Sequence, residues 1–189
     1  SPLSSVENAV VGNAYATAYG LYNVSGEVTG KALKVNLVEA KGGTGDDASA
    51  NAIGIYSENA PHTISFESLT MTKVNAEGGN GVDSASAIAY GIQNKSSYLE
   101  TTSTDATNTI IVTAKGGASG KDAHAEAYGI SHEDNGQLRL AGNWVIDVRA
   151  TAGSALGGML PENSEASAVG IMNSSGNDVT MAGSVTVSA

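Results

Sequence analysis

Three glycine-rich turns of this sequence carry the residue types of a calcium site. Residues 42–47 and 78–83 both spell Gly-Gly-x-Gly-x-Asp, and residues 116–122 repeat the pattern with one extra residue. Proteins hold calcium with carboxylates and backbone carbonyl groups, and a glycine-rich turn that ends in aspartate offers both. The candidate ligands are Asp46, Asp47, Asp83 and Asp122.

The spacing of these turns argues against calcium. Calcium-binding nonapeptide repeats follow one another directly and place a large apolar residue two positions after the aspartate. Here the first two turns begin 36 residues apart (78 − 42), and that position holds Ser49 or Ala85. We therefore expect ordinary glycine-rich turns, with no metal and no other cofactor, and retain the four aspartates as candidates for inspection.

The residue spacing does not support a transition-metal site, a nucleophilic serine or a polysaccharide-cleaving site. The three histidines, His62, His124 and His132, are scattered, and no His-Glu-x-x-His motif joins two of them, so no transition-metal site is expected. No Gly-x-Ser-x-Gly motif marks a nucleophilic serine. Polysaccharide hydrolases need clustered acids with basic residues beside them, and the only arginines are Arg139 and Arg149. We expect no catalytic residue and no enzymatic activity.

Composition excludes several kinds of partner. The 189 residues include 9 Lys and Arg against 19 Asp and Glu, a formal net charge of −10, and no run of basic residues occurs. Nucleic acid and anionic membrane surfaces are therefore not expected as partners. The absence of cysteine excludes disulfides and thiolate metal sites. No apolar run approaches the roughly 18 residues of a membrane span, and residues 1–5 do not read as a signal peptide.

One motif recurs from end to end, and it must position everything else. Small residues alternate with variable ones before a glycine, as in residues 85–91, and Ile or Leu follows each glycine. The glycines are separated by 34 (54 − 20), 37 (91 − 54), 38 (129 − 91) and 41 (170 − 129) residues. Repeats of this length indicate a solenoid or another array. The five glycines are Gly20, Gly54, Gly91, Gly129 and Gly170.

Two further sequence segments recur at a constant place in each repeat relative to this motif. One reads Val-x-Ala before a glycine-rich turn, as at Val74 and Val112, and the other is a short alternating segment such as residues 138–140. Each repeat thus offers three short strands. We expect a single domain that is a fragment of a longer array, because the last repeat is interrupted at Ala189. Its repeats are expected at about 1–43, 44–79, 80–117, 118–153 and 154–189.

Comparison of the copies indicates which strand face is buried. The positions two, four and six before the glycine are Ala in every copy except Ser164, whereas the positions between them vary. A constant small side chain at every second position marks an inward strand face. The Ile or Leu after the glycine is inward too but has the opposite parity, so we expect a phase change, with the strand turning a corner at the glycine.

In-register stacking of these copies predicts an all-β fold. Identical residues at matching positions suit parallel strands, which would form a parallel β-helix, a solenoid of about five coils with three short strands each. A β-propeller is the alternative, but it would need about four antiparallel strands per repeat. After each coil's glycine come polar turns, and Asn23, Asn94 and Asn173 there begin Asn-x-Ser sequons. A stacked Asn turn explains the same phase without any sugar.

The chain resembles the passenger regions of bacterial autotransporters, the type V secretion proteins. The resemblance rests on the recurrent Ala-x-Ala-x-Gly-Ile motif and the Val-x-Ala-x-Gly-Gly turns, together with few aromatic residues, no Cys and an acidic balance. The resemblance covers essentially the whole chain. It implies a right-handed parallel β-helix, displayed on the bacterial outer membrane through a barrel outside this chain. It carries over no functional residue. Trimeric autotransporter heads use a similar motif at much shorter intervals and are the second resemblance.

The resemblance implies a secreted, cell-surface adhesin. Its expected partners are a host or bacterial surface protein or glycan, or a second copy of the chain in autoaggregation, bound through the solenoid flanks and turns. The sequence does not identify the binding residues. A passive stalk that displays a distal domain is the alternative function, and the two differ in whether the isolated chain binds anything.

Overall fold

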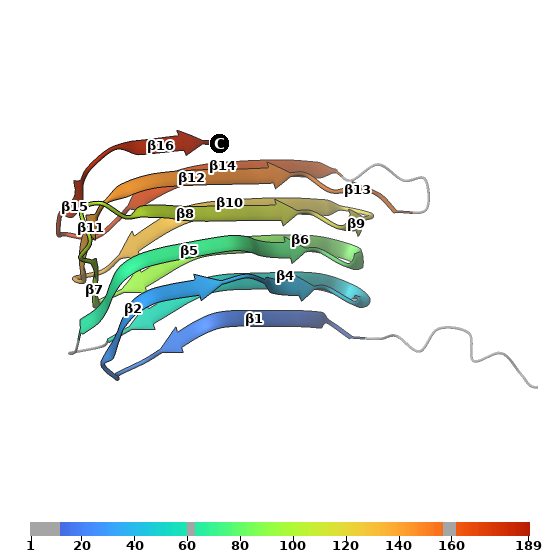
Figure 1. Ribbon diagram of the computed structural model, residues 1–189. Coiled ribbons are helices and arrows are strands. Elements are labelled where there is room, and N and C mark those ends of the chain that lie inside the picture. The colour runs from blue at the N-terminus through green and yellow to red at the C-terminus, as the bar shows by residue number, and fades with distance from the viewer. Residues whose placement is uncertain (1–11, 60–62, 157–161) are drawn as a thin grey trace, which may run out of the picture.

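The computed structural model describes residues 12–59, 63–156 and 162–189, and within these ranges it is all-β and contains no helix. Parallel strands stack into a β-solenoid of about five turns, with β1 at one end of the stack and β16 at the other (Figure 1). The predicted fold class is therefore confirmed. The described residues include no helix long and apolar enough to cross a membrane. The start of the first predicted repeat (1–11) and residues 157–161 of the fifth lie outside the described residues.

One sheet, here called sheet A, is built from the Ala-x-Ala-x-Gly lines. Its strands follow the order β1-β4-β6-β10-β14, and every neighbouring pair is parallel. Ala50 lies opposite Ala16 on one side and Ala87 on the other, so the copies stack in register. The strands are β1 (Ala14–Asn23), β4 (Thr44–Glu58), β6 (Asn80–Lys95), β10 (Asp122–Glu133) and β14 (Asn163–Asn173), with the short β9 (Ala118–Ser119) and β13 (Ser154–Ala155).

The other sheet, sheet B, contains the remaining two segments of each repeat. In the second coil a single strand, β5, runs through both segments, whereas the other coils divide them between two strands. The three predicted segments of a coil therefore form two hydrogen-bonded sheets. The strands are β2 (Val28–Val35), β3 (Val38–Lys41), β5 (Thr63–Glu77), β7 (Tyr98–Thr101), β8 (Thr107–Lys115), β11 (Gln137–Ala141), β12 (Asn143–Thr151), β15 (Val179–Ala182) and β16 (Val185–Ser188).

The core lies between the two sheets, whose inner faces differ in side-chain size. Sheet A contributes mainly Ala and Ile, and sheet B contributes Ile, Val, Leu, Met and Trp. Ala87 and Ile92 of sheet A, and Ile110 and Val112 of sheet B, have no exposed surface. Small side chains let the sheets approach closely, and each large side chain buried between them contributes about 1.5–3 kcal/mol of transfer free energy.

The repeat glycines lie directly against side chains of sheet B. A Cβ added to Gly54 would lie 2.6 Å from Met71 Sδ, and one added to Gly91 would overlap Ile110. Gly91 and Ile92 are both buried, so the inward phase changes there as predicted. The strand is not interrupted at the glycine, because β6 continues to Lys95. The missing side chain also makes room for sheet B.

Candidate functional site

The glycine-rich turns do not stack their aspartates in one row. Asp47 pairs with Ser84 rather than Asp83, because a register shift near the start of β4 places an extra residue in β6. Ser84 pairs in turn with Asp122, and Asp122 pairs with Asn163. Ser84 Oγ donates a hydrogen bond to Asp47 (2.7 Å), and Asn163 Nδ2 donates one to Asp122 (2.7 Å). The row therefore alternates carboxylates with neutral donors.

The other two calcium candidates lie beside this row. Asp83 forms an exposed ion pair with Lys121, and Asp46 is half-buried in the irregular part of β4. Across the described ranges, no group of three or more His, Cys, Asp or Glu side chains has the geometry to hold a metal ion. Hydrogen bonds and an ion pair within the turns thus engage three of the four aspartates.

The described histidines and arginines that the sequence analysis considered form no common cluster, and each has its own surroundings. His62 lies outside the described residues. His124 is on the outer face of sheet A, with Nδ1 3.5 Å from Glu165. Arg149 pairs with Asp147 at 2.8 Å on the exposed side of β12. Arg139 projects from β11 into a depression on the outer side of sheet B.

A row of polar side chains lies where sheet A ends, and it is buried in all coils but the last. Its members occupy the same position in five successive coils: Asn23, Ser57, Asn94, His132 and Asn173. Asn94 Nδ2 donates to Ser97 O at 3.0 Å and lies 3.1 Å from His132 Nδ1. Burial lowers the pKa of His132, although hydrogen bonds to backbone partially oppose the shift. The imidazole is therefore neutral and belongs to the interior.

The same row explains why the Asn-x-Ser sequons begin at one fixed position of the coil. Asn23 is nearly buried and its Oδ1 accepts a hydrogen bond from the backbone N–H of Gly26 at 2.9 Å. Asn94 has no exposed surface, whereas Asn173 is exposed. The Asn side chains close their own turns, which accounts for their spacing without a sugar.

Tyrosines gather on the outer face of sheet A, whose strands carry six of the seven in the chain. Tyr22 and Tyr56 stack with ring centroids 5.1 Å apart, and Tyr19 packs edge-on against both. Tyr90 and Tyr128 stack at 4.9 Å. Burial raises the pKa of Tyr90 to about 12 and also raises that of Tyr56, so these hydroxyls remain protonated donors. The face is an aromatic surface with polar edges.

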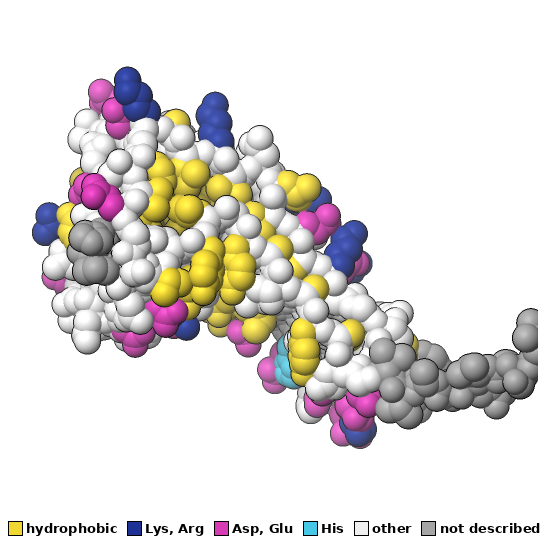
Figure 2. All heavy atoms as spheres, turned by 90° about the horizontal axis from the view of Figure 1, so that it is seen from below, with side chains coloured by type: hydrophobic (Ala, Val, Ile, Leu, Met, Phe, Trp, Pro, Cys, Tyr) yellow, Lys and Arg dark blue, Asp and Glu magenta, His cyan; other side chains and the backbone are white. Residues whose placement is uncertain are grey.

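Charge is divided unequally between the two sheets. The strands of sheet A carry eight Asp and Glu against one Lys. Those of sheet B carry five Asp and Glu against seven Lys and Arg. Viewed from the β1 end, hydrophobic side chains occupy the middle of the molecule and charged side chains lie around its margin (Figure 2). The two flanks of the solenoid therefore present opposite electrostatic character.

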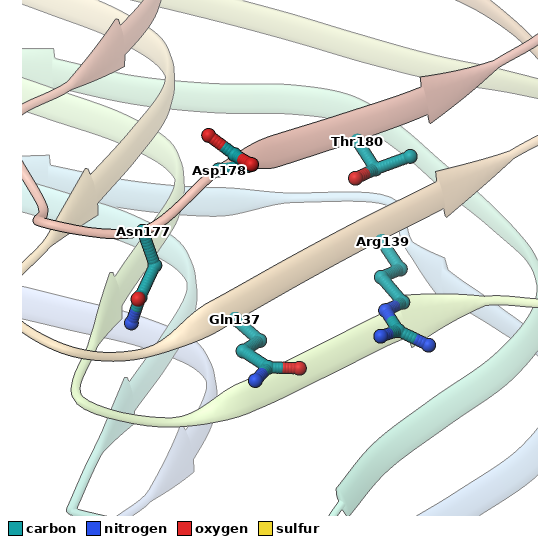
Figure 3. A pocket seen from close by; sticks show the side chains of 5 residues that line it. All are labelled: Gln137, Arg139, Asn177, Asp178 and Thr180. Atoms are coloured by element: carbon teal, nitrogen blue, oxygen red, sulfur yellow. The ribbon is translucent and has the colours of Figure 1, made fainter.

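The outer side of sheet B is hollowed between β11 and β15. The depression has a volume of about 220 Å³, and its lining residues are Gln137, Arg139, Asn177, Asp178 and Thr180. In Figure 3, Gln137 and Arg139 project from β11, whereas Asp178 and Thr180 belong to the neighbouring β15 segment. Every lining side chain is polar, so this hollow suits a ligand that forms hydrogen bonds.

Sequence reasoning missed both the division of charge and the depression. The first could have been found by counting charges separately along the Ala-x-Ala lines and along the other two lines of the repeat. The second depends on the path of the turn that joins β14 to β15, which repeat alignment does not fix.

Comparisons of the chain with family models, with curated proteins and with solved structures give no match. The fold and the chemistry of its outer faces are therefore the basis for a functional proposal.

Proposed function

We propose that this chain is an adhesive segment of a secreted cell-surface protein, an adhesin of the autotransporter passenger type that binds a like cell or a host surface through its solenoid flanks. The observation that carries the proposal is the opposite charge of the two outer faces. Complementary potentials steer surfaces together and fix their relative orientation.

The chemistry of the flanks favours a second copy of the chain as the partner. The acidic, tyrosine-rich face of sheet A would lie against the lysine-bearing face of sheet B on a neighbouring chain. Both faces repeat with the coil spacing of about 4.8 Å, so rows of side chains on one can match rows on the other. Contact between two different patches is heterologous and extends into rows of molecules instead of closing a dimer. Such growth is what adhesion between like cells requires.

Sedimentation velocity of the 189-residue chain across concentration tests this proposal. We expect association that is strong at about 25 mM NaCl and weak at about 0.5 M, because salt screens charges separated by more than the Debye length. Lys73→Glu reverses an exposed charge on sheet B and should weaken association.

The matched control is Lys121→Glu, which changes the net charge equally at the turn before β10. Lys121 belongs to no strand of either sheet, and its ion-pair partner Asp83 is on sheet A, so this variant leaves the sheet B face unchanged and should not weaken association. If both variants weaken association equally, net charge and not the sheet B face controls it, and the proposed contact is wrong.

A passive stalk is the second candidate function. The in-register rows favour it, since Ala rows run through all five coils and Leu or Ile follows the glycine in each, which makes the solenoid a regular rod. A chain that stays monomeric at every concentration and salt would support the stalk and contradict association between copies.

A further inference from the structure

The polar depression on sheet B offers a kind of binding that does not depend on contact between chains. It lies on the outer side of the solenoid, between the fourth and fifth coils, and is about 220 Å³ in volume. The flank association proposed above rests on the opposite charge of the two outer faces, whereas this hollow offers a local arrangement of donors and acceptors. The two can therefore be tested separately.

Arg139 is the strongest donor in the depression, and its charge is not matched by a carboxylate. In the register it lies beside Glu100, but Glu100 accepts hydrogen bonds from Ser65 Oγ (2.9 Å) and Tyr98 OH (3.0 Å). The guanidinium instead lies over the ring of Tyr98, 5.7 Å from its centroid. Within the described part of the chain Arg139 forms no ion pair. The Tyr98 ring holds the guanidinium plane while its N–H groups remain able to donate.

The other lining side chains add acceptors beside this donor. Asn177 Nδ2 donates to Asn135 O (2.8 Å) and Gly136 O (3.0 Å), which fixes the amide and leaves Oδ1 to accept. Asp178 supplies a carboxylate, and Gln137 and Thr180 can both donate and accept. Donors on β11 thus face acceptors on the segment that leads into β15, an arrangement that can pair with adjacent hydroxyl groups on a ligand.

The charges of the site select among polar ligands. Arg139 disfavours a cation, while Asp178 and the net charge of −10 disfavour a polyanion. The lining presents no apolar side chain to a lipid or an aromatic group. We propose that this depression is a binding site for an uncharged sugar unit, with Arg139 and Asp178 bridging neighbouring hydroxyls.

Saturation-transfer NMR with methyl glycosides of glucose, galactose, mannose and N-acetylglucosamine tests the proposal, with methyl glucuronide as the charged counterpart. The measurement is made in about 0.5 M NaCl, where association through the charged flanks is screened. We expect transfer to at least one neutral glycoside, and at least a tenfold weaker affinity in Arg139→Ala. Arg149→Ala, which removes the other arginine of sheet B, is the matched control and should bind as the parent does.

Three results would overturn the assignment: no transfer to any neutral glycoside, transfer unchanged in Arg139→Ala, or transfer to the glucuronide alone. Gln137→Ala gives a second, uncharged probe of the same hollow and should also weaken binding. Because Arg139 and Gln137 are exposed, their truncation should leave the circular dichroism spectrum unchanged. Failure here would leave association between chains untouched, since that is measured at low salt and through Lys73.

Discussion

Sheet A and sheet B line the same core with side chains of different size. Sheet A presents rows of Ala and Gly, and sheet B presents rows of Ile, Val, Leu and Trp. The first sets how closely the layers approach, and the second fills the space that remains. Core substitutions in the two sheets should therefore act in opposite ways. In sheet A, added side-chain volume should lower the free energy of unfolding most, whereas in sheet B the loss of side-chain volume should do so.

Truncation of Trp144 should give the largest effect. This side chain of β12 is 1% exposed, and its Nε1 donates to Ala141 O at 3.1 Å. Trp144→Ala should lower the free energy of unfolding by about 4 kcal/mol, because it leaves a large cavity in sheet B's inner face. Urea denaturation followed by circular dichroism measures this, since Trp144 is the only tryptophan and its fluorescence is lost.

The matching truncation in sheet A is Ala89→Gly, at a position with no exposed surface. It should cost only about 0.5–1 kcal/mol, mainly through backbone entropy. Equal costs for the two truncations would break the comparison between the sheets.

Addition of one methyl group to sheet A should rank second. The Cβ of Gly91→Ala would lie 2.5 Å from Gly129 O and would overlap Ile110 Cγ2. We expect a loss of about 2 kcal/mol in the free energy of unfolding, the usual result of overpacking. Gly176→Ala is the control, because its Cβ would meet only Asn135 Oδ1 at 3.8 Å.

A double-mutant cycle sharpens this prediction. Ile110→Ala removes the side chain that the new methyl group overlaps, so Gly91→Ala should cost less in that background than in the parent. Strictly additive losses would mean that the glycine is needed for its backbone and not for the close approach of sheet B.

His132, in the polar row at the end of sheet A, should make the stability of the fold depend on pH. His132 has a lowered pKa in the folded state, and its Nε2 has no hydrogen-bond partner within the described residues. The unfolded imidazole, with a pKa near about 6.5, therefore binds a proton at a pH where the folded one does not. Stability should fall as pH drops below about 6.5, by at most roughly 1.4 kcal/mol per pH unit.

His132→Asn provides the control, because Asn occupies the same position in three other coils. Thermal melts between about pH 7.5 and pH 5 should show the loss in the parent and not in the variant, since the carboxylates stay largely ionised there. A loss of the same size in both proteins would assign the effect to another group.

Much of this fold was readable from the sequence, and the reason lies in the repeat. Ala at three alternating positions before four of the five glycines indicated the inward face, and stacking of identical residues indicated the parallel register, as at Ala50 and Ala87. The role of Gly91 was only partly predicted, because an absent side chain permits a bend and also the close approach of another layer. Only the position of Ile110 in space reveals the second role.

The candidate site was less predictable, because it depends on irregularities. The glycine-rich turns align Asp47 with Asp83 by spelling, yet one inserted residue in β6 pairs Asp47 with Ser84. Arg139 is one residue among many polar ones in the sequence. Its availability follows from the hydrogen bonds that Glu100 accepts from Ser65 of the preceding coil and from Tyr98 of its own strand.

The smallest effect should come from the charged row outside the core. Lys41, Glu77 and Lys115 occupy one position in successive coils, and Glu77 lies 3.9 Å from Lys41 and 3.6 Å from Lys115. These side chains are well exposed, so Glu77→Gln should cost only about 0.5 kcal/mol at low salt and nothing measurable in about 0.5 M NaCl. Denaturation at the two salt concentrations checks this. A larger cost that persists in salt would show that outer rows help to hold the coils together. The expected result leaves the interior in control of stability, and so leaves the outer rows free to vary with what they bind.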